Sequence, residues 1–236
     1  LVSAHDPTST RQSLEELNAL SRWGQQHIFG DIFTNEYAPY DPWVIVVLPN
    51  ETDFIKWSVG VLGASAQQGF SRVGGAYVHD NKHLVAQDLG ATLRHEFFHV
   101  LHWRDMTRRG QNHPIWIQEG LCSLVEDYDG ANTAIKPVAS WRTNIVKRQL
   151  NAGRLERIDK LAQYSQATFS SRRPLARYAH ARTVFLYLAD TRTLRPWYER
   201  YTQTYDEDRS GIAALEHVLG KPIDEIEKDY RAWIHT

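Results

Sequence analysis

The sequence predicts an α+β fold, with a small mixed sheet near the N-terminus and helices alone after it. Three short β-type runs, 43–48, 75–79 and 83–87, all lie before residue 88. From about residue 89 onward, apolar residues recur at helical spacing. Strands in the first part of a chain and helices in the rest are typical of the α+β class.

The first fifty residues contain one helix signal and one strand signal. Ser13 followed by Glu16 forms a capping box, which predicts a helix that begins there and reaches Ile28. The Val- and Ile-rich run 43–48 lies between two prolines and predicts a buried strand. Asn50 is placed to cap a helix directly after that strand.

A hairpin and a long helix are predicted next. The runs 75–79 and 83–87 flank the turn-forming residues 80–82, which is the pattern of two antiparallel strands. Asp88 is then placed to cap a helix over about residues 89–104.

The rest of the chain is predicted to be helical. Pro114 suits the first turn of a second helix, whose buried stripe would extend to Tyr128. Residues 178–189 and 223–234 carry the clearest helical patterns beyond it. We divide the chain into a sheet-containing part, residues 1–130, and a helical subdomain, residues 131–236, that completes a cleft.

Composition excludes several classes of protein. Lys and Arg total 27 against 28 Asp and Glu, a net charge of -1, so no basic surface for nucleic acid is expected. The longest apolar run, residues 44–48, is far too short to span a membrane. A single cysteine, Cys122, forbids an intrachain disulfide. Because the chain begins at Leu1, we expect a processed product or an excerpt, with a secreted or periplasmic location favoured.

The sharpest motif is His95-Glu96-Phe97-Phe98-His99, inside the predicted long helix. Residues four apart share one face of a helix, so both imidazoles can reach one metal ion. Neutral imidazole is a good zinc ligand, and Glu96 is placed to act on a water at the metal rather than on the metal itself. The alternative is a helix face with two incidental histidines.

A catalytic zinc needs a third protein ligand, and four residues are candidates. His102 lies about 10 Å along the helix axis from His95, too far to share one ion. Asp105 has the spacing of the metzincin pattern, but that pattern requires a sharp turn where this chain has His102. His113 and Glu119 lie further on, and Glu119 follows His99 by twenty residues on the predicted second helix.

With Glu119, the sequence resembles the gluzincin metallopeptidases, in which His-Glu-x-x-His is followed by a glutamate as third zinc ligand. It looks most like their peptidase-MA-like branch, related to the aminopeptidase-type gluzincins. There the second helix commonly reads Glu-Gly, an apolar residue, small residues and a second glutamate, as residues 119–126 do here. The resemblance implies zinc ligation by His95, His99 and Glu119, with Glu126 near the ligands.

A tyrosine in that family stabilises the oxyanion formed during hydrolysis. The matching position here is Tyr178, 59 residues after Glu119, and a phenol hydroxyl is chemically suited to the task. A core tyrosine is the alternative reading, and His180 is a weaker candidate for the same role.

Two positions depart from the family. Ser123 stands where the thermolysin-like branch has an aspartate that orients a zinc histidine. Residues 74–79 lack the acid with which the aminopeptidases bind a substrate amine, although two glycines there leave room for an extended peptide.

The resemblance therefore implies a zincin-like fold and a zinc metallopeptidase acting on peptides or proteins. Glu96 would be the general base and Tyr178 a second catalytic residue, and an endopeptidase is expected rather than an aminopeptidase. The alternatives are a non-catalytic zincin-fold binding module and a metzincin-like protease with Asp105 as third ligand.

Overall fold

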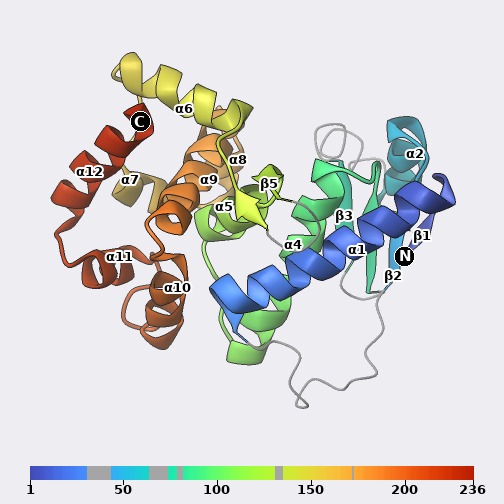
Figure 1. Cartoon of the computed structure of the whole chain (residues 1–236), viewed down its shortest axis with the longest axis horizontal. Helices are drawn as coiled ribbons and strands as arrows, with labels where there is room; N and C mark the ends of the chain where they lie inside the picture. Colours follow the sequence, from blue (N-terminus) through green and yellow to red (C-terminus); the bar gives the residue numbers. More distant parts are fainter. Residues whose placement is uncertain (31–43, 64–73, 79–81, 131–134, 172) are drawn as a thin grey trace.

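The computed structural model describes residues 1–30, 44–63, 74–78, 82–130, 135–171 and 173–236. The fold is mixed and mainly helical. A small sheet with its covering helices lies at one end, and helices form the other end (Figure 1). This arrangement agrees with the α+β class predicted from the sequence.

The sheet is mixed and has four strands in the described part of the chain, in the order β1-β2-β4-β3. They are β1 (Val2–Ser3), β2 (Val44–Val47), β3 (Gly75–Val78) and β4 (His83–Ala86). The strands β1, β2 and β4 run parallel, whereas β3 is antiparallel to β4 and lies at the sheet edge. The predicted strand and hairpin are confirmed; the turn residues 79–81 lie outside the described residues.

The first helix begins earlier than predicted. α1 (Pro7–Gly24) is capped by Asp6, whose side chain accepts from two backbone N–H groups, and it has a proline in its first turn. The capping-box prediction at Ser13 is wrong, because Asp6 and that proline already start the helix. Ser13 is buried inside the helix, where its hydroxyl donates to the Leu89 carbonyl. A π-helical segment, η1 (Gln25–Phe29), continues α1.

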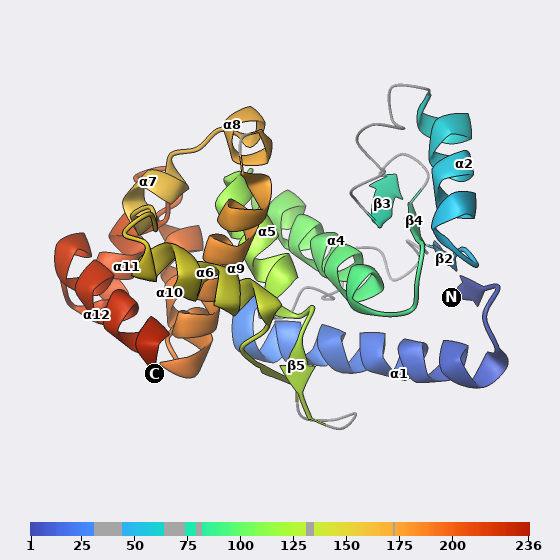
Figure 2. The same ribbon diagram turned by 90° about the horizontal axis from the view of Figure 1, so that it is seen from above.

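Helices cover both faces of the sheet. α2 (Glu51–Leu62) begins at Asn50, whose side chain accepts from a backbone N–H as predicted. It lies on one face of the sheet, while α4 (Ala91–Arg109) lies on the other (Figure 2). α4 contacts both β4 and the edge strand β3.

The long helix α4 is shifted relative to its prediction. It begins after Gly90, because the Asp88 side chain accepts from the Gly90 N–H instead of capping the first turn. It ends at Gly110, which adopts the left-handed conformation at φ 66°. Arg108 and Arg109 in its last turn favour the helix because their charges oppose the negative end of its dipole.

The second helix of the motif region is shorter than expected. α5 (Ile115–Leu124) follows Pro114 as predicted, but it ends before Tyr128. Tyr128 instead belongs to β5 (Tyr128–Asp129), which pairs antiparallel with β6 (Lys136–Pro137).

The remaining helices form the other end of the molecule, where the middle residues of α9 are buried on every side. They are α6 (Trp141–Asn151), α7 (Ile158–Ala162), α8 (Gln166–Ser170), α9 (Pro174–Asp190), α10 (Leu194–Gln203), α11 (Ile212–Leu219) and α12 (Ile223–His235). One hydrophobic core includes residues from before and after residue 130. The division of the chain at that residue stays a prediction.

Close contact between α5 and α9 depends on Gly120. A Cβ at this position would collide with the ring of Phe185 on α9. Gly120 therefore serves the close contact between α5 and α9. None of the helices in the described residues has the length and apolar character needed to cross a bilayer.

Candidate metal centre

Three side chains from α4 and α5 converge on one point. Nε2 of His95 lies 3.0 Å from Nε2 of His99, on the next turn of α4. An Oε2 of Glu119, from α5, lies 3.3 Å from the first nitrogen and 3.5 Å from the second. Among the described residues, these are the ones that form a group able to hold a metal ion.

The spacing of these atoms fits a tetrahedral zinc ion. Ligands about 2.0–2.2 Å from zinc at tetrahedral angles stand about 3.3–3.5 Å apart. The three separations of 3.0, 3.3 and 3.5 Å are close to that value. Two imidazoles and one carboxylate are also a donor set that zinc accepts. The residues present therefore fit a zinc ion, and the fourth position of the tetrahedron is left for water or substrate.

Glu126 orients the first histidine. Its Oε1 accepts a 2.8 Å hydrogen bond from Nδ1 of His95, which leaves Nε2 free to bind a metal. Arg142 in turn holds Glu126 through two hydrogen bonds of 2.7 and 2.8 Å, from Nε and Nη2. Glu126 thus fills the orienting role for which the sequence had left no residue assigned, since Ser123 replaces the thermolysin-like aspartate.

The electrostatics of the group favour a positive charge. Burial lowers the pKa of His95, but hydrogen bonds to Glu119 and Glu126 outweigh it and raise the pKa to about 10. Burial raises the pKa of Glu119, but the charges and hydrogen bonds of His99 and His95 outweigh it and hold the pKa well below its usual range. Two buried carboxylates thus hold a proton on the His95 imidazole, and the same charges would hold a divalent cation.

Glu96 lies beside the ligands and against the edge strand. It is 9% exposed, and a Cβ at Gly75 of β3 would collide with its Cγ. Gly75 is therefore the residue that admits this side chain between α4 and the sheet. Gly74, just before the strand, is also closely packed, because a Cβ there would collide with Gln87 and Thr92. Binding of an extended peptide along this strand stays a prediction.

Tyr178 lies near the same carboxylates, at the start of α9. Burial raises the pKa of its hydroxyl, and the negative charges of Glu119 and Glu96 raise it further. Its ring packs edge-on against Phe169. The hydroxyl therefore remains protonated at neutral pH, as a hydrogen-bond donor must.

The other sequence candidates lie elsewhere. Asp105 is fully buried and accepts from Arg108, Arg109 and Tyr198, because α4 continues as a helix through it. His102 is also fully buried, and its Nε2 lies 2.8 Å from Nδ1 of His113. None of these three residues joins the metal group of the described residues.

Arg182 is a supporting residue that the sequence analysis missed. It is fully buried in α9, and it donates to the carbonyls of Ser123, Asp127 and Val138 at 2.8, 3.2 and 2.7 Å. It thereby holds the end of α5 and the segment that carries Glu126. Nothing in its local sequence indicates this role, because its partners lie 44 to 59 residues away.

The chain gives no match to any protein-family model, and none to the curated proteins. The class of protein must therefore be argued from the geometry of the site.

Proposed function

We propose that this protein is a zinc-dependent metallopeptidase with a zincin-like fold, of the gluzincin type. The observation that carries the proposal is the convergence of two α4 imidazoles and one α5 carboxylate at separations of 3.0 to 3.5 Å. His95, His99 and Glu119 would hold the ion. Bound zinc would supply a Lewis acid that polarises a peptide carbonyl and lowers the pKa of water.

The chain's own residues account for the remaining chemistry. Glu96 follows a ligand on α4 and takes the proton of the attacking water, which it then delivers to the leaving amine. The Tyr178 hydroxyl donates a hydrogen bond to the oxyanion that forms at the attacked carbonyl. Glu126 keeps Nδ1 of His95 protonated so that Nε2 faces the ion.

The edge strand favours an endopeptidase over an aminopeptidase. β3 is an edge strand in contact with α4, so a peptide in extended form can lie along it. The strand, Gly75–Val78, carries no acidic side chain to receive a substrate amino group. Internal peptide bonds are therefore the proposed substrates.

The test compares the parent protein with Glu96→Gln. We expect the variant to keep its zinc and its melting temperature, while hydrolysis of a labelled protein substrate falls by about 10²–10⁴-fold. A chelator should abolish parent activity, and added zinc should restore it. Glu15→Gln, the same change at an exposed position on α1, is the control and should cleave at the parent rate.

Three results would contradict the proposed function or its mechanism. Loss of zinc from Glu96→Gln would make this residue a ligand or a structural support. Equal cleavage by the parent and Glu96→Gln would remove Glu96 from the mechanism. Zinc binding without cleavage by either protein would favour the non-catalytic binding module.

A further inference from the structure

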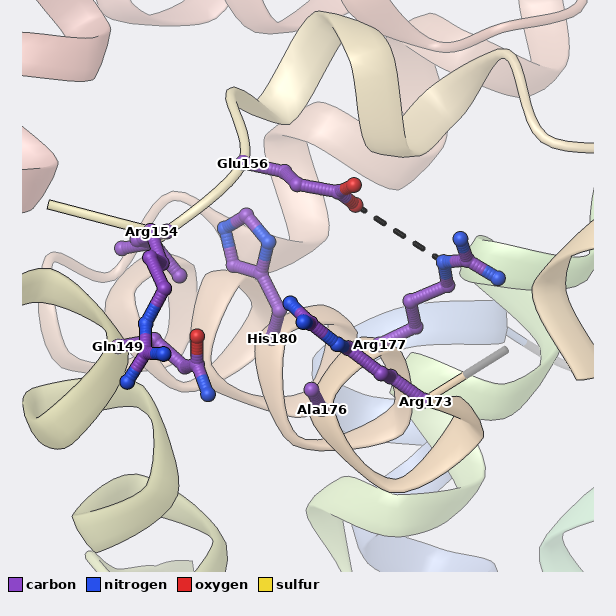
Figure 3. Close-up of a pocket in the computed structure, with 8 residues that line it drawn as sticks. Gln149, Arg154, Glu156, Arg173, Ala176, Arg177 and His180 are labelled. Carbon is purple, nitrogen blue, oxygen red and sulfur yellow. Dashed lines mark ion pairs between the residues drawn. The ribbon is translucent and has the colours of Figure 1, made fainter. Parts of the chain in front are cut away.

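A second site lies at the start of α9, on the side of this helix away from Tyr178. Residues two apart on a helix project about 200° from one another, so Tyr178 and His180 face opposite ways. A pocket of about 50 Å³ opens on the His180 side. Figure 3 shows the side chains that line it, which come from the end of α6, the segment after it and the first turns of α9: Gln149, Arg154, Leu155, Glu156, Arg173, Ala176, Arg177 and His180.

The pocket has an excess of positive charge. It is lined by three arginines and one glutamate. Glu156 is already engaged, since it pairs with Nε of Arg177 at 3.8 Å (Figure 3). It also accepts from the Tyr164 hydroxyl at 2.7 Å. Within the described residues, the guanidinium groups of Arg154 and Arg173 have no hydrogen-bond or ion-pair partner. Two cationic groups are thus left for a ligand.

His180 supplies a buried polar atom that lacks a partner. The residue is 2% exposed, and its Nε2 makes no hydrogen bond to the described residues. Its ring projects between Arg154 and Glu156 in Figure 3 and stacks on Tyr230. Burial, followed by the nearby charge of Arg231, lowers the pKa of His180 to about 3, so the imidazole is neutral and carries one N–H. An unpaired buried group of this kind costs about 1–3 kcal/mol unless a ligand or water satisfies it.

The first turn of α9 also favours a negatively charged ligand. Its N-terminus is the positive end of the helix dipole, and that end favours an anion. Arg173 stands at the N-cap in the left-handed conformation at φ 57°, which an arginine rarely adopts. Its side chain enters the pocket from the helix N-terminus, opposite Arg154.

We propose that this pocket binds a small oxyanion of the size of inorganic phosphate. Arg154 and Arg173 would give charge-assisted hydrogen bonds, and His180 would donate its N–H to a third oxygen. Donors that approach from α6, the following segment and α9 surround the ligand on several sides, which suits a compact anion with several oxygens. The proposal is independent of the proposed peptidase activity.

Phosphate binding to the full chain tests this site. We expect inorganic phosphate to raise the melting temperature in a saturable way and to give a one-to-one calorimetric isotherm, while chloride at equal ionic strength does neither. Arg173→Gly removes the guanidinium and suits the left-handed backbone, so the fold is kept. Arg154→Gln removes the second cation. Each variant should bind phosphate about tenfold or more weakly, as expected for a lost charge-assisted bond.

Arg192→Gly is the matched control. Arg192 is also a left-handed arginine, at φ 59°, but it follows the other end of α9, about 25 Å along the helix axis. It should bind phosphate as the parent does. Phosphate held at the metal centre would be unaffected by Arg173→Gly. Parent-like affinity in Arg173→Gly and Arg154→Gln, or a parent that responds equally to chloride, would overturn the proposal.

Discussion

Helix α4 contributes to two histidine pairs whose surroundings give them opposite properties. In the metal-centre pair, His95 and His99, the facing nitrogens lie 3.0 Å apart. In the buried pair, His102 and His113, they lie 2.8 Å apart. The imidazoles therefore approach one another about equally closely in both pairs, and the difference lies in what surrounds them.

Carboxylates surround the metal-centre pair, whereas aromatic rings and an amide surround the buried pair. Glu119 and Glu126 contact His95 directly, and hydrogen bonds to them raise its pKa to about 10. His113 instead donates from Nε2 to Oε1 of Gln111 at 3.0 Å and packs against Tyr201, and burial lowers its pKa to about 3. Proximity of imidazoles alone does not make a cation site; carboxylates within contact distance do.

Removal of a carboxylate from the metal centre should have the largest effect, and that effect is on zinc retention. Glu119→Ala leaves two ligands, and we expect zinc to be lost on dialysis. The decrease in affinity should exceed the about 10–100-fold that removal of an orienting partner costs. Asp105→Asn should retain zinc and lower only the melting temperature, because Asp105 holds Arg109 and Tyr198. If metal analysis shows that Asp105→Asn loses zinc and Glu119→Ala retains it, the metzincin assignment is supported.

The tyrosine beside each pair provides the second comparison. Tyr178→Phe should lower kcat by about 100-fold, with KM and zinc content unchanged, because it removes one donor to the oxyanion. Tyr198→Phe removes a hydroxyl that donates to Asp105, next to the buried pair, and should leave kcat near the parent value. Steady-state kinetics on both variants distinguish the two roles; an unchanged kcat for Tyr178→Phe would make it a core residue.

Lowering the pH should decrease the free energy of unfolding through the buried pair, His102 and His113. This is the smallest of the three expected effects. The pKa of His113 is about 3 in the folded chain and about 6.5 when unfolded, so only the unfolded chain gains this proton as the pH falls below 6.5. The stability contributed by the neutral imidazole is complete above that pH. Below it, we expect a loss of about 1.4 kcal/mol per pH unit.

His113→Gln removes this contribution while it keeps a polar group at the position. Urea unfolding between pH 6.5 and 5 should therefore show a shallower loss of stability in the variant than in the parent. The metal-centre groups titrate equally in both proteins, so they cancel in the difference. Identical slopes would mean that His113 is protonated in the folded chain.

The comparison also explains which parts of the site could be predicted from the sequence. His95, Glu96 and His99 occupy one helix, and helical periodicity alone predicts which of them share a face. Glu119 required a second helix at a suitable distance, which the family resemblance supplied. Arg142 could not be predicted, since it contacts Glu126 only because the start of α6 folds back onto the segment that follows α5.

Some boundaries of helices and strands could be predicted from local residues, whereas others depend on packing. The strand β2, the hairpin strands and the start of α2 at Asn50 follow from local turn and cap residues, and they were predicted. The start of α1 was missed because two overlapping cap signals compete, and burial of Ser13 against Leu89 favours the earlier one. Local sequence patterns allow more than one helix start, and tertiary packing decides which one is used.

The sequence by itself determined the composition class, the helix that carries His95 and His99, and the candidate third ligand. These depend on residues a few positions apart, where backbone geometry sets the relation between side chains. Only the tertiary structure decided that Asp105 and His102 are buried away from the site, and that Glu126, Arg142 and Arg182 support it. Those relations join residues of α4, α6, α9 and the segment after α5, and they exist only once the core packs these elements together.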